Sequence, residues 1–273
     1  MRRRIKKFLR KISRKIALTK REKLVLIVGL LTFGLLTVQL SPVQWRYSLT
    51  AVLVLATYLL ATWGLREDLG GIEWLTLFIL PTMYAGAVTL FYFLLPVRWL
   101  TRLPTAVLFA LGMYAILLVE NIYNVAAIRT IQLLRAAHSV GLLLTLITCF
   151  LLLAIIFSLH LPFFWNFLLV FIVSFPLSLQ SLWAMKLEPK ISQEIFLYTM
   201  VISLVLSELA FVFSFWPIQT VIEALFLTTV FYSLVGMVQQ HLLERLFKRT
   251  MIEFIAVSAI VFILVLVTTR WGG

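Results

Sequence analysis

Charged residues are scarce in this chain of 273 residues, and aspartate and cysteine are almost missing. Lys, Arg, Asp and Glu make up 13% of the sequence, whereas soluble domains carry about 25%. Asp68 is the only aspartate, which argues against magnesium–diphosphate chemistry that relies on clustered aspartates. Cys149 is the only cysteine, so disulfides within the chain and zinc sites built from several cysteines are excluded. We expect Cys149 to be a small packing residue inside an apolar helix.

The usual signatures of catalytic sites are missing as well. The sequence has no P-loop, no G-x-G-x-x-G and no G-x-S-x-G motif, which removes the standard patterns of ATP-driven pumps and serine hydrolases. His138, His160 and His241 lie at the ends of different apolar stretches, so they do not predict a metal cluster. We therefore expect no cofactor and no metal, and we rank an enzyme acting on lipid-linked substrates last among the alternatives.

Apolar residues are abundant and form repeated stretches. They make up 62% of the chain, in runs long enough for a helix to cross the hydrocarbon layer, which takes about 20 residues. The runs lack the alternation of membrane strands. The sequence therefore predicts an all-α, polytopic transmembrane helix bundle of about nine spans. The predicted spans are residues 24–40, 48–64, 74–95, 105–126, 139–159, 162–184, 194–214, 218–239 and 252–270. The very short connection at 158–162 leaves eight spans as the alternative.

Tryptophan positions support this division, because indole rings prefer the headgroup layer. Every tryptophan falls at or near the end of a predicted span. They are Trp45, Trp63, Trp74, Trp99, Trp165, Trp183, Trp216 and Trp271.

Positive charge is concentrated at the N-terminus and on one set of connections. The formal net charge is +13, and half of the Lys and Arg residues precede residue 24. By the positive-inside rule, this places the N-terminus in the cytoplasm. Connections on the same side carry Arg66, Arg129, Arg135, Lys186, Lys190, Arg245, Lys248 and Arg249, whereas the opposite side carries Arg46, Arg98, Arg102 and Arg270. We expect the bacterial plasma membrane; an Arg-rich, acid-poor start is also typical of mitochondrial transit peptides.

Two segments follow from this pattern. Residues 1–23 form a basic segment with apolar residues at helical spacing, and residues 24–273 form a single transmembrane domain. The basic segment is expected to lie on the membrane surface and contact anionic lipids rather than nucleic acid. A membrane-protein partner or a second copy of the chain is left open.

Glu120, Asn121 and Asn124 form the first candidate site. At about 100° per residue they fall within one arc of the fourth predicted helix. An ionised carboxylate in a span costs about 2.5 to 3.5 kcal/mol on insertion scales, so such residues indicate function. The arc would line a cavity or a lipid headgroup site, or else hydrogen bond between helices and lock the bundle. It continues through Arg129, Arg135 and His138, which we expect to contact headgroups at the interface.

Glu208 and Glu223 form the second candidate site. They flank the turn at Trp216 and Pro217 and are expected about 9 to 12 Å below it. If they face each other, the two carboxyl groups would share one proton and couple transport to proton movement. The sequence does not establish that they face each other.

Two further patterns favour transport. Pro81 and Pro176 interrupt two spans, and Ser178, Gln180 and Ser181 follow the second, where they could bond freed carbonyls. Similar endings at 91–96 and 211–217 suggest a parallel repeat. The best functional hypothesis is a small permease or channel-like protein. A non-catalytic scaffold or assembly module is the alternative.

Overall fold

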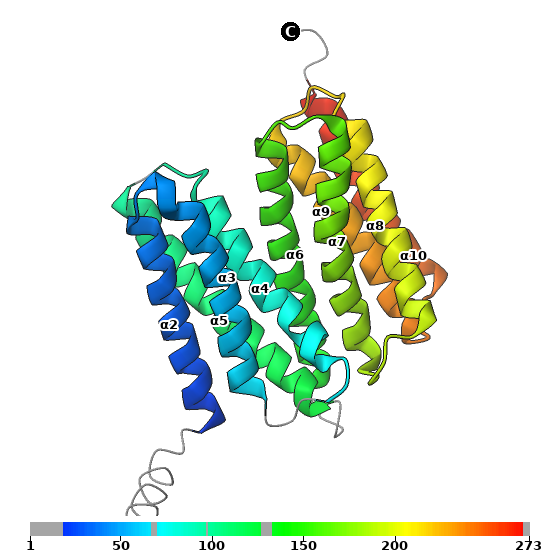
Figure 1. Ribbon diagram of the computed structural model, residues 1–273. Helices are drawn as coiled ribbons and strands as arrows, with labels where there is room; N and C mark the ends of the chain where they lie inside the picture. Colours follow the sequence, from blue (N-terminus) through cyan, green and yellow to red (C-terminus); the bar gives the residue numbers. More distant parts are fainter. Residues whose placement is uncertain (1–18, 67–69, 97, 127–132, 270–273) are drawn as a thin grey trace, which may run out of the picture.

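The computed structural model describes residues 19–66, 70–96, 98–126 and 133–269. Within these ranges all regular structure is helical, and nine helices are long and apolar enough to cross a membrane. They are α2 (Lys20–Leu40), α3 (Val43–Leu65), α4 (Glu73–Tyr92), α5 (Trp99–Ala126), α6 (Leu134–Ser158), α7 (Phe163–Lys186), α8 (Gln193–Phe213), α9 (Thr220–Leu242) and α10 (Lys248–Thr268) (Figure 1). The predicted all-α bundle of spanning helices is confirmed, whereas the side on which the N-terminus lies stays a prediction.

The helix bounds differ most from the predicted spans at α5. This helix begins at Trp99 rather than at residue 105 and runs through Pro104. Pro104 is the sixth residue of this helix, so its missing amide leaves the carbonyl of Leu100 without its intrahelical donor. The short connection at 158–162 does separate two helices, α6 and α7, with His160 in the left-handed region at φ 47°.

Hydroxyl side chains inside the helices find partners on their own helix. Thr57 bonds the carbonyl of Leu53 at 2.8 Å, and Ser203 bonds that of Thr199 at 2.8 Å. Such bonds satisfy a polar group without water, which is what a lipid environment requires.

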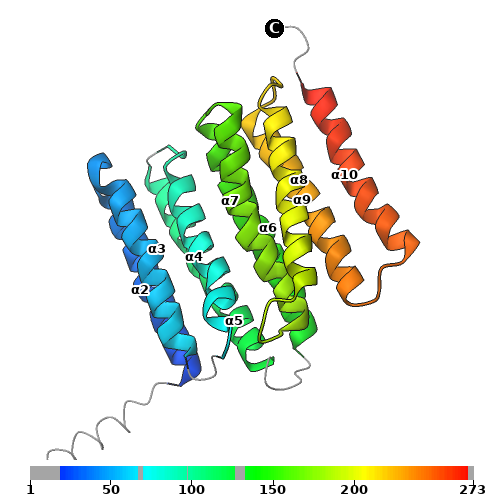
Figure 2. The same ribbon diagram turned by 45° about the vertical axis from the view of Figure 1, so that its right-hand side comes forward.

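The helices form two groups of four, α2–α5 and α6–α9, which we call the first and second halves (Figure 1). Within each half every helix packs against the next, and the fourth packs against the first. α4 and α8 therefore hold the same place in their halves. The order of packing is the same in the two halves, and the parallel repeat stays a prediction. α10 lies at one edge of the molecule against α9 (Figure 2).

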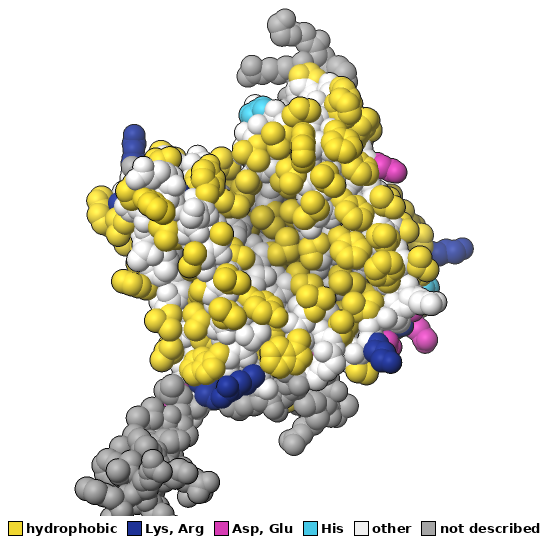
Figure 3. Space-filling view, viewed as in Figure 1, with side chains coloured by type: hydrophobic (Ala, Val, Ile, Leu, Met, Phe, Trp, Pro, Cys, Tyr) yellow, Lys and Arg dark blue, Asp and Glu magenta, His cyan; other side chains and the backbone are white. Residues whose placement is uncertain are grey.

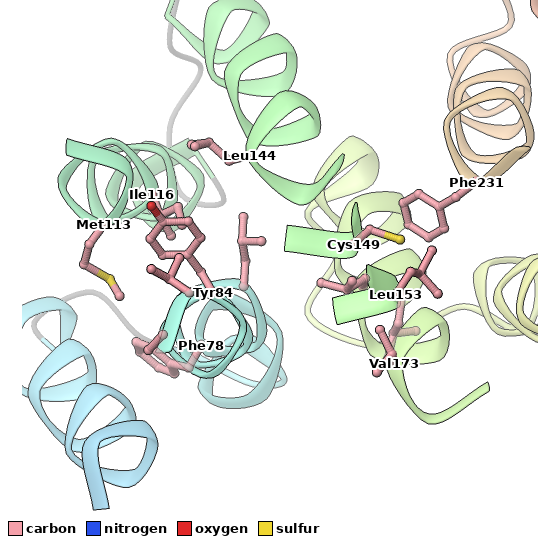
Figure 4. Close-up of a cluster of buried hydrophobic side chains, with 14 of the residues drawn as sticks. Phe78, Tyr84, Met113, Ile116, Leu144, Cys149, Leu153, Val173 and Phe231 are labelled. Atoms are coloured by element: carbon pink, nitrogen blue, oxygen red, sulfur yellow. The ribbon is translucent and has the colours of Figure 1, made fainter. Parts of the chain in front are cut away.

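Buried apolar side chains fill both halves. Phe78, Tyr84, Met113 and Ile116 lie in the first half, and Cys149, Leu153, Val173 and Phe231 in the second (Figure 4). Cys149 is free and buried, as expected of a packing residue. Large apolar side chains also cover the outer surface, and the charged side chains visible in Figure 3 lie at its margins.

The two halves are joined tightly at the end that Figure 1 shows at the bottom, which we call the lower end. Here the connection before α4 contacts the connection before α8, and the amide of Ile72 donates to the carbonyl of Pro189 at 3.4 Å. Gly71 has φ +51°, and a Cβ atom there would lie 2.7 Å from the same carbonyl oxygen. Only glycine suits both the backbone angle and this close approach.

Single-cysteine labelling tests the alternation of the helices. In a Cys149→Ser background, Gln44→Cys and His160→Cys should react with a membrane-impermeant maleimide from one side, and Lys190→Cys from the other. The first two positions are separated by four spans, and α7 separates the second from the third. Labelling of all three from the same side would contradict the span assignment. If Lys190→Cys reacts only after cells are permeabilised, the predicted cytoplasmic N-terminus also holds.

Candidate functional site

Polar side chains gather at the lower end, where α5, α6, α7 and α9 come together. Three come from α5, one from α6, two from α7 and one from α9. We call this set the polar network: Glu120, Tyr123, Asn124, His138, Gln180, Ser181 and Gln239.

Glu120 is the only acidic member of the polar network, and its side chain is completely buried. The amide nitrogen Nε2 of Gln180 donates a hydrogen bond to Oε1 of Glu120. Because Glu120 is on α5 and Gln180 on α7, this bond crosses from one half to the other. The second carboxyl oxygen, Oε1 of Gln180 and Oδ1 of Asn124 are buried and have no hydrogen-bond partner among the described residues.

Two amide side chains occupy matching places in the two halves. Asn124 on α5 donates to the carbonyl of Leu65, at the end of α3, at 3.0 Å. Gln239 on α9 donates to the carbonyl of Ser181 at 3.1 Å and to its hydroxyl at 2.9 Å, near the end of α7. In each half the fourth helix thus bonds the backbone near the lower end of the second. These bonds stabilise each half, and the bond from Glu120 then connects the halves.

Tyr123 and His138 complete the junction. The hydroxyl of Tyr123 donates to the carbonyl of Ala137 at 3.0 Å, which is a second bond between the halves that involves a side chain. Nε2 of His138 lies 2.9 Å from the carbonyl of Ala184, so the ring nitrogen donates there. A Cβ atom on Gly141 would lie 2.5 Å from the Tyr123 hydroxyl oxygen, so glycine is needed for the close approach of α5 and α6.

A small cavity of about 10 Å³ adjoins these groups. Its polar lining comes from Thr145 and from five members of the polar network. The five members are Tyr123, His138, Gln180, Ser181 and Gln239. A cavity of this size has room for about one water molecule, and its lining offers enough polar partners to hold one.

The first predicted site is assembled in part. Glu120 and Asn124 are both completely buried. The Asn121 side chain is half-buried and forms no hydrogen bond with the other described residues. Asn124 lies about 40° around the helix from Glu120, whereas Asn121 lies about 100° away, toward a less buried face. Whether these residues line a transport cavity stays a prediction.

The predicted interface residues have different surroundings. Arg135 is exposed near the start of α6, whereas His138 is half-buried and bonded into the polar network. Arg129 and residues 1–18, which include most of the basic segment, lie outside the described residues. Their expected contacts with anionic lipid therefore stay predictions.

Glu208 and Glu223 do not form a pair in the structure. Glu208 lies on the exposed face of α8, whereas Glu223 on α9 is 8% exposed and its Oε1 lacks a partner among the described residues. No hydrogen bond between described atoms joins the two. The buried stripe of α8 contains Ser203 and Ser207, and Glu208 is one residue beyond that stripe.

Sequence reasoning missed the partners of Glu120. Gln180 and Ser181 were expected to bond carbonyls freed by Pro176, but they bond Glu120 and Gln239 instead. The sequence pattern did not predict a role for Gln239. The available signal was an amide side chain inside an apolar span, which is expensive to bury and therefore finds a partner on another helix.

These features define a polytopic helical membrane protein with a buried polar junction between two four-helix halves. The chain belongs to the family described as "Protein of unknown function (DUF5656)", whose model matches residues 57–268. The match runs from within α3 to the end of α10 and includes the whole polar network. No curated protein and no solved structure matches the chain.

A double-mutant cycle tests the bond between Glu120 and Gln180. Glu120→Leu, Gln180→Leu and the double variant should show a coupling free energy of about 1 kcal/mol, because interhelical hydrogen bonds in membranes have this size. The free energy of unfolding is measured by reversible denaturation in mixed micelles. The control cycle joins Glu120→Leu with Ser233→Ala, whose hydroxyl contacts Ser258 on α10. Equal coupling in both cycles would show that the bond does not connect the halves.

Proposed function

We propose that this chain is a small proton-linked permease in which Glu120 carries the proton and the two halves move relative to each other. The bacterial plasma membrane is its proposed location, on the strength of the basic N-terminus. The observation that carries the proposal is the fully buried Glu120, hydrogen bonded by Gln180 across the junction of the halves.

Hydrogen-bond accounting favours a proton at this site. Three buried acceptor atoms around Glu120 have no donor among the described residues: its own Oε2, Oε1 of Gln180 and Oδ1 of Asn124. A buried acceptor without a donor costs about 1 to 3 kcal/mol. A proton on Glu120 converts one carboxyl oxygen into a donor and also removes the cost of burying a negative charge. Binding and release of one proton would therefore change the strength of the contact between the halves.

In this proposal the proton would reach Glu120 by way of the small cavity beside Gln180. Tyr123 and His138 are the titratable side chains of the polar network besides Glu120, and both line the water-sized cavity. α7 and α9 contribute the neutral side chains of Gln180, Ser181 and Gln239. A water molecule in the cavity would bond Gln180, whose side chain in turn bonds the Glu120 carboxyl group.

The arrangement of the halves supports movement between them. Each half is a ring of four helices, and an amide side chain forms a hydrogen bond inside each half near the lower end. Repeats of this kind move as rigid bodies in many transporters, with the coupling site at the repeat interface. The polar network lies at such an interface.

A second candidate function is a membrane assembly module. Glu208 exposes a carboxyl group on a face of α8 that also carries Val201 and Val212, at 57% and 54% exposure. An acid on an otherwise apolar outer face favours contact with a polar group of another helix, from a partner or a second copy. Stable co-purification of a stoichiometric protein partner would favour this function over transport.

Charge movement in proteoliposomes tests the permease. The purified protein is reconstituted and exposed to pH jumps with panels of amino acids, organic anions, organic cations and sugars on a solid-supported membrane. Glu120→Gln, which keeps the shape of the side chain but cannot release a proton, should abolish the proton-dependent current. Glu208→Gln, an exposed carboxyl changed in the same way, should leave it unaltered.

An infrared difference spectrum between acidic and alkaline pH gives a readout that needs no solute. The native protein should show a protonated carboxyl band that disappears in Glu120→Gln and persists in Glu208→Gln. A current that survives Glu120→Gln would contradict the proposal. If Glu208→Gln and Glu223→Gln each lost the current while Glu120→Gln kept it, proton coupling would be assigned to the pair predicted from the sequence.

A further inference from the structure

A groove between α4, α5 and α6 lies in the upper part of the molecule, whereas the polar network lies at the lower end. Its volume is about 450 Å³, within the range of about 300 to 1,000 Å³ that small-molecule sites occupy. Buried side chains form its floor and exposed ones form its rim. The floor includes Tyr84, Val88 and Leu144, and the rim includes Leu108, Leu111 and Ile147.

The lining of the groove is apolar because its one buried hydroxyl group is already bonded. The hydroxyl of Tyr84 donates to the carbonyl of Leu108 at 3.0 Å. A Cβ atom on Gly112 would lie 2.1 Å from that hydroxyl oxygen, so the absence of a side chain there allows the ring to lie against α5. Figure 4 shows the Tyr84 ring between α4 and α5. The groove therefore suits a hydrocarbon chain rather than a polar solute.

Arg102 lies close to Thr105, a residue that lines the upper part of this groove. Arg102, Thr105 and Gly112 on α5 follow one another at helical spacing, and the latter two line the groove. Arg102 is three residues before Thr105, so the two are neighbours on the helix surface and Arg102 lies beside the lining rather than in it. Its Nε donates to the hydroxyl of Tyr92 at 3.1 Å, and its guanidinium lies 5.2 Å from the centre of the Trp99 ring.

These contacts hold the guanidinium in place without neutralising it. No carboxylate among the described residues forms an ion pair with Arg102 or with Arg98 nearby. Trp99 is 67% exposed, as expected of an indole ring in the headgroup layer. A fixed, unpaired arginine at that depth is suited to a phosphate group.

We propose that the groove binds one acyl chain of an anionic phospholipid whose phosphate lies on Arg102. The chain would cover the buried floor formed by Tyr84 and Val88, and the exposed rim would let it enter sideways from the bilayer. Arg98 adds a second positive charge for an anionic headgroup. This site goes beyond the proposed permease and does not depend on Glu120.

Native mass spectrometry tests the lipid site directly. The full chain in detergent micelles is titrated with phosphatidylglycerol or with phosphatidylcholine of the same acyl chains. One phosphatidylglycerol per chain should be retained, and Arg102→Gln should weaken its binding by about tenfold, the loss expected for one charge-assisted hydrogen bond. Lys190→Gln, which removes an exposed positive charge at the lower end, should leave binding unchanged.

Filling the groove tests the acyl chain. Leu108→Trp, on the rim, should abolish retention of the lipid, whereas Leu55→Trp on α3, a leucine of similar exposure outside the groove, should not. Inorganic phosphate alone should neither bind nor compete at millimolar concentration, because the groove supplies most of the contact. Equal retention of both lipids, or retention unaffected by Leu108→Trp and Arg102→Gln, would overturn the site. Glu120→Gln should bind the lipid normally, so failure here is separate from failure of the permease.

Discussion

A buried carboxyl group in an apolar bundle needs a partner, and the hydrogen bond between Glu120 and Gln180 meets that need across the junction of the two halves. Hydrophobic burial alone does not hold spanning helices together, because lipid tails are as apolar as the side chains they would replace. The halves therefore depend on polar contacts and close packing. These are concentrated at the lower end, where Tyr123 also bonds the carbonyl of Ala137 and Gly71 lies against Pro189.

The location of these contacts separates the molecule into a joined end and an end with a groove. Asn124 and Gln239 form matching hydrogen bonds inside the two halves, and these bonds stabilise each half internally. Between the upper parts of α4, α5 and α6 the helices leave a groove of about 450 Å³. A change at Glu120 would act on the contact between units, and a lipid chain in the groove would fill the space between them where side chains do not.

The sequence predicted the helices well, because a span of about 20 apolar residues is a strong and local signal. It also singled out Glu120 and Asn124, since helical phase places them on one arc. Gln180 and Gln239 were not recognised as partners, because a sequence does not show which of nine spans lie side by side. Glu208 and Glu223 were predicted to lie at the same depth, but they are on different faces of their helices. Glu208 is exposed and Glu223 is buried. Only the packing of α8 against α7 and α9 decides that difference.

We propose that Glu120 controls the contact between the two halves, and a distance measured across the upper end tests this proposal. Spin labels are placed at Gln44→Cys on α3 and Phe164→Cys on α7 in a Cys149→Ser background, and electron double resonance is recorded at mildly acidic and mildly alkaline pH. We expect two distance populations whose ratio changes with pH in the native chain and stays fixed in Glu120→Gln. A single distance at both pH values, or the same pH response in Glu120→Gln, would contradict it.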